Sequence, residues 1–211
     1  MIRILICDDH TIVRQGLRQI LADTDDILVT AEAGSGAEAL RLVREGDFDL
    51  VLLDIAMPQR DGLDVLKQLK DEFPRLPVLI LSTYPEKQYA LRCLKLRASG
   101  YLNKSSDPDQ LAAAIRKAAT GGRVVSPALA EILAEEVAQP VERLPHEMLS
   151  HREYQVFCQI AQGHSVGQIA EQLALSPNTV STYRARILEK IGGHNDVEIA
   201  LYAVKHALVT P

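Results

Sequence analysis

Residues 50–54 read Leu-Val-Leu-Leu-Asp, four apolar side chains followed at once by an acid. Because successive side chains of a strand point to opposite faces, a strand at residues 50–53 is apolar on both faces. Two-sided burial of this kind is typical of central strands in the parallel sheets of α/β proteins. Asp54 then follows the carboxyl end of a central strand, which is the edge where open α/β sheets bind their ligands.

Short apolar runs alternate with amphipathic runs of helical period over the first 120 residues. The predicted strands are Ile2–Cys7, Ile27–Ala31, Leu50–Leu53, Val78–Leu81 and Gly100–Leu102. The predicted helices are Val13–Leu21, Ala37–Val43, Leu63–Leu69, Glu86–Leu96 and Pro108–Ala119. Repeats with crossovers of this length predict an α/β fold, with a doubly wound, five-stranded parallel sheet covered by helices on both faces.

The chain divides after this pattern. Gly121-Gly122 ends the last helix, and residues up to Met148 contain three prolines and five Asp or Glu against two Lys or Arg. We interpret residues 121–147 as a connector, with a short helix at 128–137. The predicted domains are therefore residues 1–120 and 148–211.

The last segment has a purely helical pattern. Ser150 and Glu153 form a capping box, and Ser165 and Ser176-Pro177 are further helix starts. The predicted helices are Tyr154–Ala161, Val166–Leu173, Asn178–Ile191 and Val197–Ala207. Four short helices predict a small, separate all-α domain.

Composition restricts the class of protein. The 211 residues carry a formal net charge of −5, which argues against a protein that coats a polyanion, so any contact with nucleic acid must be local. The three cysteines are far apart and lack metal-ligand spacing, as expected of buried thiols in a reducing compartment. The first residues resemble no targeting segment and no apolar run is long enough to cross a bilayer, so we expect a cytoplasmic location.

Acidic side chains follow two of the predicted strands. Asp8-Asp9 follows the first and Asp54 the third, so three carboxylates meet at one edge of a parallel sheet. Such carboxylates repel one another unless they are protonated, paired or bridged by a cation such as Mg²⁺. We predict that Asp54 accepts a phosphoryl group and that Asp8, Asp9, Asp54 and the backbone carbonyl of Ala56 hold Mg²⁺.

Two more polar groups are expected at this edge. In a sheet ordered 2-1-3-4-5, Ser82 ends the fourth strand and Lys104 follows the fifth, so both reach Asp54. Taken singly, the aspartates are also good turn formers and Lys104 a solvated loop residue. Polar groups at the ends of four different strands are poorly explained by coincidence.

The second domain contains the layout of a helix-turn-helix, a short helix followed after a turn by a helix starting at Ser176-Pro177. On the second helix we expect Ser181, Thr182 and Ala185 nearest to DNA base edges. We expect Asn178, Thr179 and Arg186 to contact phosphates or bases, and Arg184 to reach a flanking phosphate rather than a base. Lys190 is a further expected DNA-binding residue. The alternative is a helical bundle with a solvated polar face, because this domain has as many acidic as basic residues.

The first 120 residues resemble the receiver domain of bacterial two-component response regulators. The resemblance rests on Asp8-Asp9, Asp54 with Met57-Pro58 and Gly62, Ser82-Thr83, and Gly100-Tyr101-Leu102-Asn103-Lys104. It implies a CheY-like sheet, Mg²⁺, and phosphorylation of Asp54 by a sensor histidine kinase. It also implies that Lys104 contacts the phosphoryl group and that Ser82 and Tyr101 form a switch pair, with Tyr101 turning inward afterwards.

Residues from 148 onward resemble the LuxR-type DNA-binding domain. The matching stretches are residues 149–153, 160–163, 169–170, 175–180 and 187–191. The whole chain thus resembles a NarL/FixJ-type response regulator and is similar to its GacA/UvrY-like and BvgA-like members. This implies a homodimer that binds promoter DNA. The implied dimer residues, Val197, Leu201, Val204 and Leu208, have the spacing of an apolar seam, although they could equally be core.

The chain departs from these families at a few positions. Ser105 replaces a common proline, Ser82 a common threonine, and Ser181 a common lysine. Ala56 and Tyr84 flank the path of an attacking water but cannot position it, so we expect slow self-dephosphorylation.

Two other functions remain open from the residues alone. A magnesium phosphohydrolase would need an acid or base where Ala56 stands, so we expect no enzyme beyond self-phosphorylation and slow self-dephosphorylation. The other alternative is a protein-interaction module that never binds DNA.

Overall fold

The structure, a computed structural model, describes residues 1–57, 62–84, 86–138 and 144–209. The chain forms two compact units, residues 1–139 and 140–211. Among the described residues, none of the helices combines the length and the apolar character needed to cross a bilayer.

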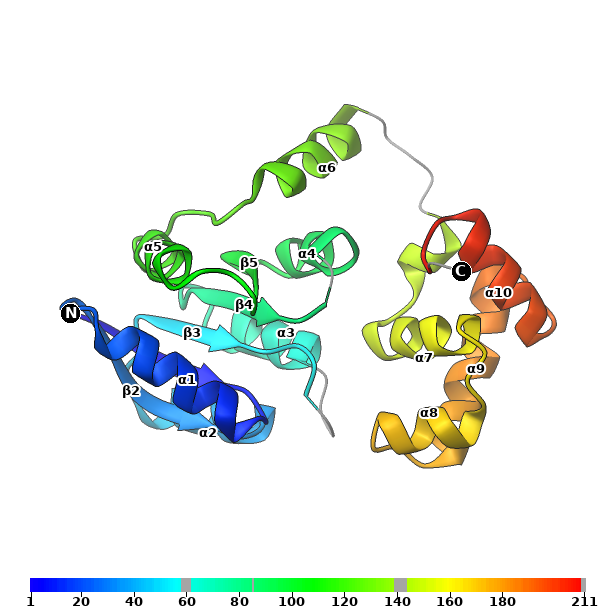
Figure 1. Ribbon diagram of the computed structural model, residues 1–211, viewed down its shortest axis with the longest axis horizontal. Coiled ribbons are helices and arrows are strands. Elements are labelled where there is room, and N and C mark those ends of the chain that lie inside the picture. The colour runs from blue at the N-terminus through cyan, green and yellow to red at the C-terminus, as the bar shows by residue number, and fades with distance from the viewer. Residues whose placement is uncertain (58–61, 85, 139–143, 210–211) are drawn as a thin grey trace. The chain divides into compact units, whose positions relative to one another are not determined.

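The first unit is built on a parallel sheet in the order β2-β1-β3-β4-β5, which confirms the predicted fold (Figure 1). Its strands are β1 Ile2–Cys7, β2 Ile27–Ala33, β3 Leu50–Leu53, β4 Val78–Ser82 and β5 Gly100–Asn103. All four residues of β3 are buried, as the run of apolar side chains predicts. β4 and β5 extend one residue beyond the prediction because Ser82 pairs with Asn103, although both are polar.

Helices cover both faces of this sheet. They are α1 Thr11–Ala22, α2 Gly36–Glu45, α3 Gly62–Glu72, α4 Glu86–Lys95 and α5 Pro108–Ala119. Leu17 and Leu21 of α1 and Ile115 of α5 share one core cluster with Ile4 and Leu52 of the sheet, so α1 and α5 lie on the same face. Since crossovers between parallel strands are right-handed, the strand order places α2, α3 and α4 on the other face.

A close approach at Gly62 sets the start of α3 directly against the end of β3. A Cβ atom on Gly62 would lie 2.4 Å from the carbonyl oxygen of Asp54 and 2.4 Å from the Cα of Ile55. Both neighbours are backbone atoms, which cannot move aside cheaply. Only glycine therefore lets α3 begin this close to the end of β3.

The segment after α5 packs on the first unit. Val124 donates a backbone hydrogen bond to Ser99 and lies beside Gly100 at the edge of β5. Helix α6, Pro127–Ala138, then packs against α4, and its Leu129 is fully buried. A helix does occupy the middle of the predicted connector, but it is part of the first unit rather than a free spacer. Residues 139–143 of that connector lie outside the described part of the chain.

The second unit is all-helical. It contains η1 Pro145–Met148, α7 His151–Ala161, α8 Val166–Gln172, α9 Pro177–Ile191 and α10 Asp196–Lys205. The predicted caps at Ser150, Ser165 and Ser176 each accept a hydrogen bond from the backbone three residues later. Helix α7 packs against α9 and α10, and α8 against α9. Their fully buried residues include Phe157, Ile169, Val180, Ile187 and Ile199.

Candidate functional site

The carboxyl edge of the sheet brings the predicted acids together. Asp8 and Asp9 follow β1, Asp54 follows β3, and the backbone N–H of Asp54 donates to the Cys7 carbonyl at 2.9 Å. This bond sets the ends of β1 and β3 side by side. Ligand atoms of Asp8, Asp9, His10 and Asp54 all lie within 4.8 Å of one another.

Lys104 joins two of these carboxylates. Its Nζ lies 2.6 Å from Asp8 Oδ2 and 2.7 Å from Asp54 Oδ2. Its backbone N–H donates to the Ser82 carbonyl, so the end of β4 positions the lysine. Burial alone would lower the pKa of Lys104, but the hydrogen bonds to Asp54 and Asp8 outweigh burial and the pKa is raised. The ammonium is therefore firmly protonated.

Asp54 is almost completely enclosed, with 1% of its side chain exposed. Burial raises the pKa of Asp54, and the hydrogen bonds from the Ala56 backbone N–H and from Lys104 offset only part of this rise. The carboxylate thus carries a charge that is poorly solvated, as expected of a group that reacts with a phosphoryl donor. Ala56 is half-buried beside it, and the predicted role of its carbonyl as a metal ligand stays a prediction.

Ser82 and Tyr101 lie next to this edge. Ser82 is fully buried, and its hydroxyl accepts a hydrogen bond from the Tyr84 backbone N–H at 3.3 Å. Tyr101 is 2% exposed and donates to the Tyr84 carbonyl at 2.8 Å, while burial raises the pKa of its hydroxyl. The ring of Tyr101 is therefore buried in this structure, and its role in a switch pair with Ser82 stays a prediction.

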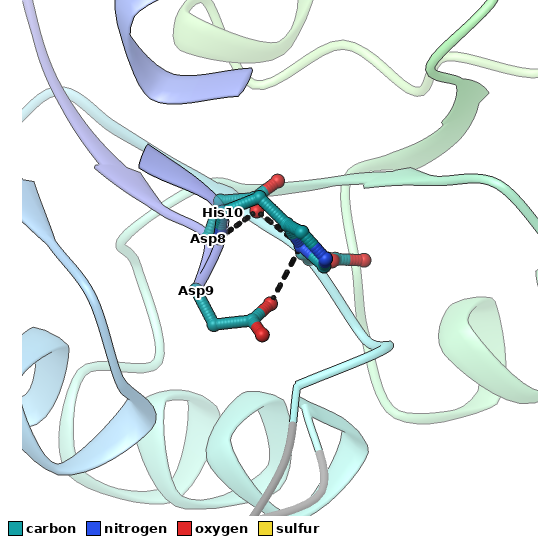
Figure 2. A group of neighbouring side chains, drawn as sticks. Asp8, Asp9 and His10 are labelled. Atoms are coloured by element: carbon teal, nitrogen blue, oxygen red, sulfur yellow. Dashed lines mark hydrogen bonds and ion pairs between the residues drawn. The ribbon is translucent and has the colours of Figure 1, made fainter. Parts of the chain in front are cut away.

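His10 is a member of the site that the sequence analysis missed. Its Nδ1 lies 3.0 Å from Asp9 Oδ1 and 3.4 Å from Asp8 Oδ1, and Figure 2 shows the ring beside both carboxylates. The only signal in the sequence is its position directly after the two acids.

The donor set fits a divalent cation. Asp9 Oδ1 is buried and has no hydrogen-bond partner among the described residues, so an oxygen ligand is left over. Carboxylate oxygens are the ligands that Mg²⁺ prefers. The acidic group of Asp8, Asp9 and Asp54 is therefore suited to hold such an ion.

The second candidate site is the outer surface of α9. Asn178, Ser181, Thr182, Ala185 and Arg186 are exposed, while Val180 and Ile187 are buried. Thr179 is half-buried, and its backbone N–H donates to the capping Ser176 hydroxyl at 3.1 Å. The three residues expected nearest to base edges, Ser181, Thr182 and Ala185, are thus all exposed.

Two of the predicted DNA-contacting cations have partners inside the unit. Arg184 Nε lies 2.6 Å from Asp196 Oδ1, at the start of α10. Lys190 Nζ lies 2.6 Å from Glu153 Oε2, in the capping box of α7. Burial would raise the pKa of Glu153, but hydrogen bonds from Lys190 and Ser150 lower it overall. Lys190 thus ties α9 to α7, a structural role that the sequence did not indicate.

The apolar residues of α10 divide between two faces. Ile199 and Ala203 are fully buried, whereas Val197, Leu201 and Val204 are 67%, 65% and 54% exposed. Leu208, beyond the end of the helix, is half-buried. Three of the four predicted seam residues therefore lie on the surface of the unit rather than in its core.

Comparison with known families gives two matches. Residues 4–116 match the response regulator receiver domain, and residues 147–203 match the bacterial regulatory proteins of the luxR family. The chain is 39% identical over 210 residues to the response regulator GacA of Pseudomonas aeruginosa, covering 99% of this chain and 98% of that protein. It is 35% identical over 209 residues to the response regulator UvrY of Escherichia coli, covering 99% and 96%.

Solved structures give the same picture. The response regulator ChrA of a heme-sensing two-component system is similar with a TM-score of 0.54 and 35% identity, over 99% of this chain and 98% of that chain. RcsB of Salmonella enterica serovar Typhimurium, bound to the promoter rprA with a phosphomimetic, has a TM-score of 0.63 and 25% identity, over 95% and 97%.

Proposed function

The chain belongs to the bacterial response regulators that join a receiver domain to a LuxR-type DNA-binding domain, and from this we propose that phosphorylation of Asp54 by a sensor histidine kinase controls its binding to promoter DNA. The observation that carries the proposal is the ammonium of Lys104 held between Asp54 and Asp8. Because the pKa of Lys104 is raised, this ammonium stays charged and can pair with the phosphoryl oxygens that Asp54 would gain. Both partners, a kinase and promoter DNA, correspond to a cytoplasmic location.

The proposed transfer starts from a phosphohistidine. An Asp54 oxygen attacks phosphorus, a P–O bond forms, and the P–N bond to the kinase imidazole breaks with the electron pair staying on nitrogen. Lys104 neutralises charge on the phosphoryl oxygens. Asp8, Asp9, Asp54 and the Ala56 carbonyl would hold Mg²⁺, which when bound shields the carboxylates and the incoming phosphoryl oxygens from each other.

Phosphorylation adds roughly 1.5 to 2 negative charges and new acceptor oxygens at Asp54. The Ser82 hydroxyl, which now accepts from the Tyr84 backbone and interacts with Tyr101, would turn its proton toward a phosphoryl oxygen. Tyr101 holds the same stretch through the Tyr84 carbonyl, so we propose that Ser82 and Tyr101 act together on the loop before α4. The change at Asp54 would thus reach α4 and the helix α6 that packs on it.

The second unit provides the proposed output. Ser181, Thr182 and Ala185 lie on the exposed side of α9, where they would meet base edges in the major groove. Asn178, Thr179 and Arg186 would contact phosphates or bases, and Arg184, which pairs with Asp196, would reach a flanking phosphate. A solved relative, RcsB, is bound to promoter DNA. Lys190 would contribute less, because Glu153 already pairs with its charge.

Dimer formation is proposed through α10. Val197, Leu201 and Val204 form an exposed apolar row, extended by Leu208. A surface row of this kind is stabilised when a second copy buries it. RcsB is also solved as dimers on DNA. Two copies on paired half-sites would compensate for the weak binding of one domain whose acidic and basic residues balance.

The test compares the oligomeric state and the affinity for genomic promoter fragments before and after treatment with beryllofluoride and Mg²⁺. The wild type should gain dimer and DNA affinity, and Asp54→Asn should not respond. The matched control is Asp64→Asn, an exposed acid in α3, which should respond like the wild type. A response that survives in Asp54→Asn would exclude Asp54 as the acceptor, and turnover of phosphate esters would favour a phosphohydrolase.

A further inference from the structure

We propose that His10 is a ligand of the divalent cation at the carboxyl edge, and that it shifts the preference of this site from Mg²⁺ toward Mn²⁺, Co²⁺ and Zn²⁺. The inference rests on the proposed function in one respect only, namely that a cation binds beside Asp54. It adds a nitrogen ligand to a site otherwise made of oxygens.

The distances around His10 are those of ligands that share an ion. First-row metal ions lie about 2.0 to 2.2 Å from nitrogen and oxygen ligands, so neighbouring ligands lie about 3 Å apart and opposite ligands about 4 Å apart. His10 Nδ1 is 3.0 Å from Asp9 Oδ1 and 3.4 Å from Asp8 Oδ1. Ligand atoms from all four residues, Asp54 included, lie within 4.8 Å of one another.

The backbone directs the imidazole to this place. His10 is the residue that precedes α1, and its backbone N–H donates to Asp8 Oδ1 at 2.8 Å. This short turn folds residue 10 back over residue 8. The side chain does not cap the helix, and within the described part of the chain its ring is paired only with Asp8 and Asp9. Figure 2 shows the ring facing these acids, although 63% of the side chain is exposed.

An unused oxygen lies next to the ring. Asp9 Oδ1 is buried and makes no hydrogen bond within the described residues, even though His10 Nδ1 is only 3.0 Å away. When Nδ1 is unprotonated, these are two acceptor atoms 3.0 Å apart, which are suited to bind the same cation. Lys104 pairs with the other two carboxylates, Asp8 and Asp54, whereas within the described residues only the His10 ring lies in ion-pair distance of Asp9.

The nitrogen ligand determines which divalent cation the site prefers. Mg²⁺ favours oxygen ligands, whereas the affinity of a mixed nitrogen and oxygen site rises from Mn²⁺ through Co²⁺ and is higher again for Zn²⁺. Removal of the imidazole should therefore weaken the binding of Mn²⁺, Co²⁺ and Zn²⁺ more than that of Mg²⁺.

The direct test is electron spin echo envelope modulation on Mn²⁺ bound to the full-length protein, which detects a coordinated imidazole nitrogen. The wild type should show imidazole modulation and His10→Ala should lose it. His194→Ala, which removes an exposed histidine of the second unit, is the matched control and should keep it. Titrations should show about a tenfold loss of Mn²⁺ and Co²⁺ affinity in His10→Ala, with Mg²⁺ affinity nearly unchanged.

Two results separate this inference from the proposed function. Tight Mn²⁺ binding without imidazole modulation, with affinities unaltered in His10→Ala, would overturn the role of His10 and leave the acidic site intact. Mn²⁺ binding that is unaltered in both Asp9→Asn and Asp54→Asn would place the ion elsewhere, and would contradict the proposed metal site as well as the inference.

Discussion

Lys104 Nζ lies between Asp54 Oδ2 and Asp8 Oδ2, at 2.7 Å and 2.6 Å, so one ammonium holds two buried carboxylates together. The lysine side chain is 13% exposed and the two aspartates 3% or less. Water therefore screens these charges only slightly. The arrangement links the chemistry proposed for Asp54 to the stability of the first unit.

Replacing Lys104 with methionine should destabilise this unit. The substitution keeps most of the apolar stem but leaves Asp8 and Asp54 facing each other without a cation, which costs about 2 to 4 kcal/mol. Urea denaturation in the presence of EDTA measures the loss. Lys117→Met, in an exposed lysine of α5, is the control and should change the free energy of unfolding little. Equal stabilities of Lys104→Met and the wild type would show that the bridge contributes nothing.

Replacing Asp54 with asparagine should have the opposite effect near neutral pH. Because burial raises the pKa of Asp54 above its ordinary value of 3.8, the ionised carboxylate opposes folding at any pH above that range. Asparagine removes this cost, while the ion pair between Lys104 and Asp8 remains. The melting temperature without metal should therefore rise by roughly 2 to 5 °C at pH 7.

The sign of this effect gives its pH dependence. As the pH falls through the raised pKa of Asp54, the folded wild type takes up a proton and recovers stability. The difference in melting temperature between the wild type and Asp54→Asn should therefore shrink, and vanish below about pH 4. Melting curves from pH 4 to pH 8 in EDTA check this. A difference that widens on acidification would mean that the folded state lowers the pKa of Asp54.

Self-dephosphorylation should be limited by Ala56 and Tyr84. Ala56 has no polar side chain, and the ring of Tyr84 stacks on Tyr89 with the centroids 4.7 Å apart, so neither aligns an attacking water. Ala56→Asn with Tyr84→Glu should hydrolyse the acyl phosphate about tenfold faster. Decay of radiolabelled phosphoprotein measures the rate, with Thr83→Ala as a control at an exposed neighbour. Unchanged decay would rule out these positions.

The sequence predicted the sheet and the edge site well because both depend on local patterns. Leu50–Leu53 is apolar at every position. Asp8 and Asp54 each follow a strand and Ser82 ends one, so the parallel topology alone brings them together. The direction of the Tyr101 ring and the turn that folds His10 over Asp8 depend on side-chain rotamers, which no periodicity encodes. The pairing of Lys190 with Glu153 joins residues 37 positions apart and appears only in the packed domain.

The two cations of α9 should therefore behave differently. Arg186 is exposed, and Arg186→Ala should weaken promoter binding. It should also reduce the slope of the logarithm of DNA affinity against the logarithm of salt concentration by about 1. Lys190→Ala should lower stability by about 1 kcal/mol by loosening the capping glutamate of α7. Because the pKa of Glu153 is lowered in the folded state, its stabilising contribution is present above the ordinary value of 4.5 and is lost on acidification.

Shift assays over a range of salt concentrations and melting curves distinguish these roles. If Lys190→Ala changed the salt slope as much as Arg186→Ala while its stability stayed at that of the wild type, Lys190 would be a DNA contact instead of a structural residue.

The exposed apolar row on α10 should form the dimer interface. Leu201→Glu places a charge in the middle of the row, between Val197 and Val204, where a second copy would have to bury it. Leu201 is 65% exposed, so the monomer should fold normally and keep its melting temperature within about 2 °C. Sedimentation of the protein treated with beryllofluoride and Mg²⁺ should show loss of the dimer, and promoter affinity should fall because the paired half-sites are no longer bound together.

Leu28→Glu, at a 46% exposed leucine of the first unit, is the matched control and should leave the dimer intact. If Leu201→Glu remained dimeric and Leu28→Glu became monomeric, the second copy would bind through the first unit, and the row on α10 would be an ordinary exposed surface.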